Sequence, residues 1–147
     1  DNKGWVACPP RAGKGAGMTD DTKDRVLDAA LVHVPFDGWS DRTLRAALVD
    51  AGADPRLARA LFPRGGVDLA LAYHARGDAA MVARLQATDL SALRFRDRIA
   101  AAIRARLEVA DQELVRRGTT LFSLPMHAAD GAKAIWGTAD RIWTALG

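Results

Sequence analysis

The residues that could carry chemistry are three histidines, one cysteine and a group of aspartates near the start of the chain. His33, His74 and His127 lie far apart in the sequence, and none has a second ligand type at metal-binding spacing, so we expect no zinc or di-iron site. Because Cys8 is the only cysteine, an internal disulfide and a thiolate cluster are excluded. A helix start and a solvated helix face explain the aspartates without acid–base catalysis. These aspartates are Asp20, Asp21, Asp24 and Asp28.

The composition excludes several other classes of protein. The chain has no nucleophile elbow, phosphate loop or dinucleotide fingerprint, so we expect neither an enzyme nor a cofactor. With 147 residues, 49% of them hydrophobic and 27% charged, it is typical of one folded globular domain. Apolar stretches are far shorter than the roughly 20 residues that cross a bilayer. A net charge of +3 permits an anionic partner such as phosphate or acidic lipid without requiring one.

The chain is expected to divide into a leader of residues 1–18 and a single helical domain of residues 19–147. The leader is rich in glycine and proline and ends at Met18, which indicates a disordered leader or sequence added upstream. Helical spacing begins with Thr19 as a cap, and Pro35 is expected to stop this first helix. Further helices are expected at about 41–51, 55–62, from 66 onward with an interruption near Gly77, 92–109, 111–122 and 126–146.

A short glycine-containing turn separates the expected helices at 41–51 and 55–62, which predicts a helix-turn-helix. The second helix of such a motif reads bases in the major groove of DNA. Here only Arg56 and Arg59, with Arg64 just beyond, could make contacts, because the rest of that helix is small or apolar. Nearby aspartates oppose phosphate binding, so these arginines are candidates for phosphate or headgroup contact or for a solvated face. The residues expected to cap or end the two helices are Ser40, Gly52 and Asp54.

The last helix carries an apolar stripe wider than contact with one neighbouring helix requires. The stripe either fills an ordinary core or lines an elongated cavity suited to a lipid tail. Burying several hundred Å² of such a tail at about 25 cal/mol per Å² supplies on the order of 10 kcal/mol before association costs. The residues expected to line the tail site are Leu121, Phe122, Ile135, Trp136, Ile142 and Trp143. In the 92–109 helix, large apolar side chains recur at every fourth position, and small alanines lie beside them. The large residues are Phe95, Ile99, Ile103 and Leu107.

Several runs of the sequence resemble the Coq-nine family of ubiquinone-biosynthesis proteins. The first and most specific run is Ala29-Ala30-Leu31-Val32-His33-Val34-Pro35-Phe36-Asp37-Gly38-Trp39-Ser40, followed by Leu44, Ala46-Ala47 and Phe62-Pro63-Arg64-Gly65. Similar later runs are Arg98-Ile99, Arg106-Leu107-Glu108, Leu124-Pro125, Trp136 and Ala139-Asp140-Arg141-Ile142-Trp143. The resemblance therefore covers nearly everything after Met18.

This resemblance implies an all-α, TetR-like fold, with residues 19–66 as the helix-turn-helix part and 67–147 as the lipid-binding part. Such proteins are often dimeric, are not catalytic, and bind lipids including ubiquinone intermediates. The family is thought to present the quinone precursor to a di-iron demethoxyubiquinone hydroxylase at the membrane. Its chain continues past the position of Gly147 to an amphipathic membrane helix, so we expect this chain to be truncated at its C-terminus relative to the family.

The leading hypothesis is thus an accessory protein that holds an isoprenoid quinone precursor or a phospholipid and forms a homodimer. It would lie in the bacterial cytoplasm, peripheral to the inner membrane, or on the matrix side of the mitochondrial inner membrane in a eukaryote. The alternative is a TetR-type transcriptional regulator that senses an apolar ligand, although the weak reading helix argues against a DNA partner. A third possibility is a purely structural dimer.

Overall fold

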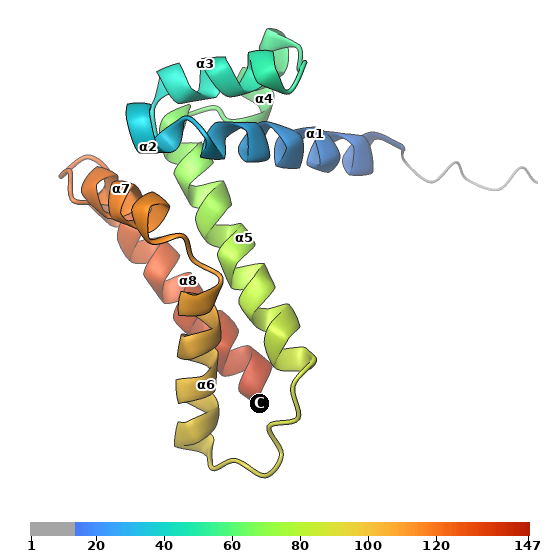
Figure 1. Cartoon of the computed structure of the whole chain (residues 1–147), viewed down its shortest axis with the longest axis vertical. Coiled ribbons are helices and arrows are strands. Elements are labelled where there is room, and N and C mark those ends of the chain that lie inside the picture. The colour runs from blue at the N-terminus through green and yellow to red at the C-terminus, as the bar shows by residue number, and fades with distance from the viewer. Residues whose placement is uncertain (1–13) are drawn as a thin grey trace, which may run out of the picture.

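The computed structural model describes residues 14–147, and every regular element in that range is helical (Figure 1). This confirms the all-α prediction for the described part of the chain. The long helices are α1 (Lys14–Leu31), α3 (Asp41–Asp50), α5 (Gly66–Gln86), α6 (Phe95–Glu108), α7 (Gln112–Phe122) and α8 (Ala128–Leu146). The short ones are α2 (Val34–Asp37), the 3₁₀ turn η1 (Pro55–Leu57) and α4 (Ala58–Leu61).

Helices α1 to α4 gather at one end of the long helix α5, while α6 and α8 run beside its remaining length (Figure 1). Two groups of buried side chains hold these parts together. The first joins α1 to α4 with the start of α5 and includes Val26, Ala30, Leu44, Phe62 and Leu69. The second joins α5, α6 and α8 and consists of Met81, Leu85, Ala102, Ala105 and Leu146.

The first helix begins earlier and ends differently than the sequence predicts. Because α1 starts at Lys14, Thr19 lies inside the helix instead of capping it, and the Thr22 hydroxyl donates to the Met18 carbonyl oxygen at 2.9 Å. The prediction of a disordered leader is therefore wrong for residues 14–18, and its remainder, residues 1–13, lies outside the described residues. Pro35 does not end the first helix either, because α1 already ends at Leu31. It occupies the first turn of α2, where a missing N–H costs nothing.

The predicted caps around the central turn are confirmed. The Ser40 hydroxyl accepts a hydrogen bond from the Thr43 amide at 3.2 Å, and the Asp54 carboxylate accepts one from the Arg56 amide at 2.9 Å. Gly52 ends the turn after α3 with a φ of 61°, which favours glycine. The segment expected to be one reading helix is instead the 3₁₀ turn η1 followed by the single turn α4. A DNA-binding helix-turn-helix stays a prediction.

Helix α5 is continuous, so the interruption expected near Gly77 is wrong. A side chain at position 77 would meet the Arg106 guanidinium, whose Cζ lies 2.6 Å from the site of a Cβ atom. Glycine is needed at this position because the Arg106 side chain, which comes from α6, packs directly against the surface of α5. The loss in helix propensity, about 1 kcal/mol, is offset by the tertiary contact.

Helix α6 turns its small residues inward and its large ones outward. Ala102 and Ala105 are buried against α5 and α8, whereas the exposed fractions of Ile103 and Leu107 are 48% and 69%. Alanines allow the helix axes to approach closely, which decides the face that is buried. No helix among the described residues has both the length and the apolar character needed to span a bilayer.

Candidate functional site

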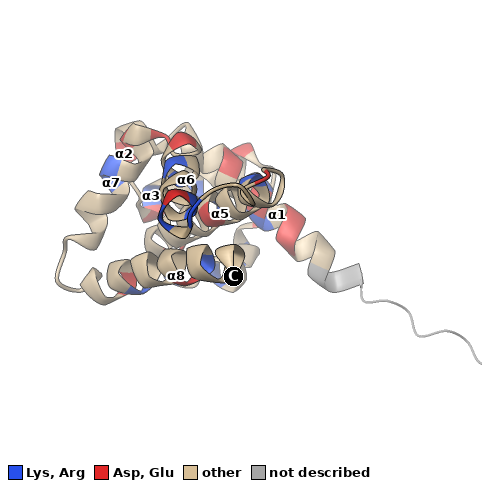
Figure 2. Cartoon of the chain, turned by 90° about the horizontal axis from the view of Figure 1, so that it is seen from below, with Lys and Arg blue, Asp and Glu red and all other residues tan. Residues whose placement is uncertain are grey.

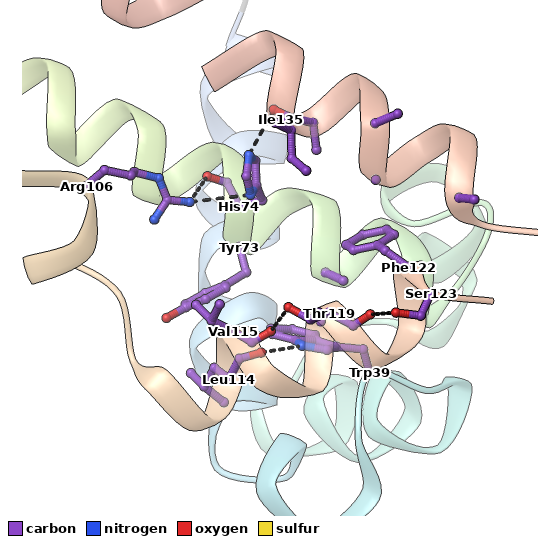
Figure 3. Close-up of a pocket in the computed structure, with 16 residues that line it drawn as sticks. Trp39, Tyr73, His74, Arg106, Leu114, Val115, Thr119, Phe122, Ser123 and Ile135 are labelled. Atoms are coloured by element: carbon purple, nitrogen blue, oxygen red, sulfur yellow. Dashed lines mark hydrogen bonds between the residues drawn. The ribbon is translucent and has the colours of Figure 1, made fainter. Parts of the chain in front are cut away.

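An apolar cavity of about 480 Å³ lies among α5, α7 and α8 (Figure 3). Its volume falls within the range of roughly 300–1,000 Å³ that is common for ligand pockets. Carbon-rich side chains form most of the wall, with polar groups confined to a few positions. The main apolar contributors are Trp39, Tyr73, Leu114, Val115, Phe122 and Ile135.

Small residues create the room in this cavity. Gly131 on α8 lies so close to α7 that an added Cβ would be 2.8 Å from the Phe122 Cβ atom, so the glycine lets the two helices meet. Gly118 on α7, in contrast, has space around the position of a Cβ atom. A Cβ added there would meet only the Trp39 Nε1 atom, at 3.7 Å, and a longer side chain would extend into the open space.

The aromatic wall is held in place by two hydrogen bonds to the start of α7. The Trp39 indole donates to the Leu114 carbonyl oxygen at 3.1 Å, and its ring lies 5.4 Å from the Tyr73 ring, centroid to centroid. The Tyr73 hydroxyl accepts a hydrogen bond from the Asp111 amide at 3.1 Å, just before α7 begins. Trp39 and Tyr73 each satisfy their polar atom while presenting apolar surface, as buried aromatic residues of this kind usually do.

A buried carboxylate, Asp78, joins three helices beside the cavity. Its side chain is fully buried and accepts hydrogen bonds from the Arg106 Nε atom at 2.8 Å and from the Arg141 Nη1 atom at 2.9 Å. The Thr138 hydroxyl donates to the same carboxylate at 2.9 Å. Such a buried charge is tolerated only when it is paired and hydrogen-bonded. We call Asp78, Arg106, Arg141, Thr138 and His74 the Asp78 cluster.

The hydrogen bonds around His74 define which of its nitrogens carries a proton. Because the Thr138 hydroxyl gives its proton to Asp78, its oxygen accepts from the His74 Nε2 atom at 2.8 Å. The Nδ1 atom faces the Arg106 Nη2 atom, a pure donor, at 3.4 Å. A tautomer with the proton on Nε2 satisfies both contacts. Among residues 14–147, no three His, Cys, Asp or Glu side chains come together as possible metal ligands.

The structure brings two of the six predicted tail-site residues, Phe122 and Ile135, to the cavity. Leu121 packs instead against the first core and Ile142 against the second. Trp136 and Trp143 lie on the outside, with exposed fractions of 75% and 64%, and Trp143 makes an edge contact with Phe95 at 5.4 Å.

These four residues do not line the cavity, and for Trp136 and Trp143 the reason lies in the packing of α8. Close contact with α7 requires Gly131, which turns the small side of the helix inward and its tryptophans outward. Charged side chains are sparse along much of α8, as Figure 2 shows.

The three arginines singled out in the sequence do not form one anion site. Arg56 is paired with Asp54 at 2.6 Å, and this hydrogen bond raises the pKa of the guanidinium. Arg64 binds Asp130 at the start of α8, at 2.9 Å, and also Asp68, so it ties the N-terminal helices to α8. Within the described part of the chain, Arg59 is exposed and has no ion pair.

Sequence reasoning missed the Asp78 cluster. The one local signal is the spacing of His74 and Asp78, which places both on the same face of α5. Arg106 and Arg141 come from other helices, and only the packing of α6 and α8 against α5 shows that they meet the same carboxylate.

The fold and the cavity together define a class: an all-helical protein with a largely apolar, partly open site of ligand size. The sequence is 27% identical over 146 residues to "Ubiquinone biosynthesis protein COQ9, mitochondrial" of Drosophila melanogaster. This similarity covers 95% of the chain but 44% of the relative, so the chain spans less than half of that protein's length. No protein-family model matches the chain. The similarity supports the resemblance to the Coq-nine family noted in the sequence.

Proposed function

We propose that the protein is a lipid-binding accessory protein of ubiquinone biosynthesis. It holds an isoprenoid quinone precursor in the cavity and presents it to the demethoxyubiquinone hydroxylase. The observation that carries this proposal is the apolar cavity of about 480 Å³ beside α7 and α8. The name of the similar Drosophila protein supplies the pathway.

The chemistry of the cavity supports binding over catalysis. Its wall is mainly apolar, and the Asp78 carboxylate beside it already accepts hydrogen bonds from two guanidiniums and a hydroxyl. A carboxylate held this way is poorly placed to take a proton from a ligand. We therefore propose a carrier, not an enzyme, acting as a homodimer at the surface of the bacterial inner membrane or of the mitochondrial inner membrane.

Filling the cavity tests this proposal. Gly118→Phe places a ring in the open space, whereas Gly118→Ala makes the matched small change at the same position. The full-length protein and both variants are purified from the native host, and bound lipids are extracted and identified by mass spectrometry. We expect prenyl lipid with the wild type and Gly118→Ala, and a loss of at least about tenfold with Gly118→Phe, as an obstructed pocket costs over 1.4 kcal/mol.

Two results would contradict the proposal. One is the absence of any prenyl lipid or phospholipid from the wild-type protein. The other is an equal lipid content in correctly folded Gly118→Phe, which would place the lipid elsewhere. Phospholipid alone would support a lipid site but contradict a quinone cargo.

The regulator alternative has less support. Its reading segment is a 3₁₀ turn and one α-helical turn, and its first arginine, Arg56, is already paired with Asp54. Sequence-selective, salt-dependent DNA binding would restore that alternative.

A further inference from the structure

We propose that Arg106 determines which end group the cavity accepts: it binds the oxygen-bearing end of an apolar ligand, with an anionic end preferred. The apolar wall then takes the tail. This inference rests on the proposed function, because it needs an apolar molecule in the cavity.

Arg106 reaches the cavity from α6 with one nitrogen still available. Its Nε atom donates to Asp78 at 2.8 Å, and its Nη2 atom donates to the His74 carbonyl oxygen at 3.2 Å. Its Nη1 atom has no hydrogen-bond partner among the described residues. No buried side-chain nitrogen or oxygen in that part of the chain lacks a partner, so this nitrogen is not sealed inside the protein. Arg106 is among the residues that line the cavity, and we infer that Nη1 is the donor that a ligand there would meet.

The charged group of the cavity lies away from Phe122, and the hydroxyls of Thr119 and Ser123 on the Phe122 side bond to carbonyl oxygens of their own helix. Figure 3 shows Arg106 and His74 toward one side of the site and Phe122 toward the other. An elongated ligand can therefore place an oxygen at Arg106 and its carbon chain along α7 and α8. This is the usual division in small-molecule sites, where a few polar groups orient a ligand held by apolar contact.

The balance of charge beside the cavity favours oxygen and disfavours a cation. The single Asp78 carboxylate is shared by the guanidiniums of Arg106 and Arg141. The cluster therefore has one positive charge in excess. The side chain of Arg106 is only 15% exposed, so its attraction to an anion is screened less than at the surface.

The guanidinium is held ready for this contact. Asp78 and the His74 carbonyl oxygen orient it from two directions, and Gly77 leaves the space that it occupies. A donor that is already ordered loses little conformational freedom when a ligand binds. Asp78 and Gly77 are thus positioning residues, and Arg106 is the one that touches the ligand.

The test uses three probes that share one tail: dodecanoate, dodecanol and dodecylammonium. Their affinities for the delipidated full-length protein are measured by calorimetry. We expect the order carboxylate, alcohol, ammonium, with the carboxylate about 10- to 100-fold tighter than the ammonium, the range of a charge-assisted hydrogen bond. Arg106→Gln should bring this ratio close to one while dodecanol still binds.

Arg106→Lys covers the case in which the glutamine variant fails to fold. A lysine keeps the positive charge beside Asp78 but cannot also offer the second arm of the guanidinium, so the ratio should fall, by less than in Arg106→Gln because the excess charge remains. Arg104→Gln, at an exposed position of the same helix that does not line the cavity, is the matched control and should keep the wild-type ratio.

The outcomes separate this inference from the function on which it rests. If the wild type binds dodecanol but does not prefer the carboxylate to the ammonium, Arg106 has no such role and the apolar site stands. An unchanged ratio in folded Arg106→Lys has the same meaning. If none of the three probes binds, the proposed lipid site itself is wrong.

Discussion

Replacing Asp78 with asparagine should strongly destabilise the protein, because it removes the one charge shared by three helices. In the native structure the two carboxylate oxygens accept hydrogen bonds from Arg106, Arg141 and Thr138. An asparagine has nearly the same shape but only one acceptor oxygen. The NH2 group of the asparagine would face N–H or O–H groups that are themselves donors, and the two guanidiniums would lose the negative charge that balances them.

The expected size of this effect follows from the burial of the groups. Removing one partner of a buried ion pair costs about 3–5 kcal/mol. Arg106 is only 15% exposed and stays largely dehydrated, whereas Arg141 is 48% exposed and regains water. The lower end, about 3 kcal/mol, therefore applies. For a chain of 147 residues this lowers the melting midpoint by roughly 9 °C, at about 3 °C per kcal/mol.

Thermal and urea unfolding, followed by far-ultraviolet circular dichroism, measure this loss. Asp140→Asn is the matched control, since Asp140 is an exposed aspartate of α8, and it should change stability by no more than about 0.5 kcal/mol. A cycle with Asp78→Asn and Arg106→Gln, alone and together, isolates their coupling. If Asp78→Asn is as stable as Asp140→Asn, the cluster does not hold the helices together and the reasoning is refuted.

Three further changes probe the helix ends. Gly66→Ala should lower the free energy of unfolding by about 3 kcal/mol or more in urea, since its Cβ would lie 2.5 Å from the Trp39 carbonyl oxygen and 2.6 Å from the Ser40 Cα atom. Ser40→Ala should cost about 1 kcal/mol in the same assay through the lost cap of α3. Hydrogen bonds from two arginines, Arg116 foremost, lower the pKa of Glu113 from 4.5 to about 2. This carboxylate therefore stabilises the fold above pH 4.5, and the contribution is lost as pH falls toward 2. Glu113→Gln should lack this contribution, which melting midpoints measured across that pH range would show.

The sequence predicts the helices well wherever local chemistry decides their ends. The caps Ser40 and Asp54 and the turn at Gly52 can be read directly, because each acts through its own backbone neighbourhood. The start of α1 before Thr19 is a local error, and other errors occur where contacts from distant parts of the chain decide the structure. Gly77 suggests a break in α5, yet the helix continues because the Arg106 side chain fills the space beside it.

The site could be predicted only in part, since apolar spacing identifies a helical stripe without saying which side of it is buried. In α8 the large residues Trp136 and Trp143 suggest the inner face, but the helix packs closely on Phe122 of α7 at Gly131 and buries that side. The same reversal occurs in α6, where Ala102 is buried and Leu107 is exposed. Close helix packing selects small residues, and a count of apolar positions does not contain that preference.

The same packing explains why the cavity and the Asp78 cluster occur together. The glycines and alanines that let α7 and α8 approach their neighbours leave too little side-chain volume to fill the space between them. Side chains that line such a hollow have fewer protein neighbours than packed ones, so other interactions must hold the walls in place. Asp78 supplies that hold by tying α5 to both α6 and α8 through hydrogen-bonded charges. These contacts hold the cavity walls in place, and the Arg106 guanidinium that helps to hold them is also the donor that we propose for the ligand.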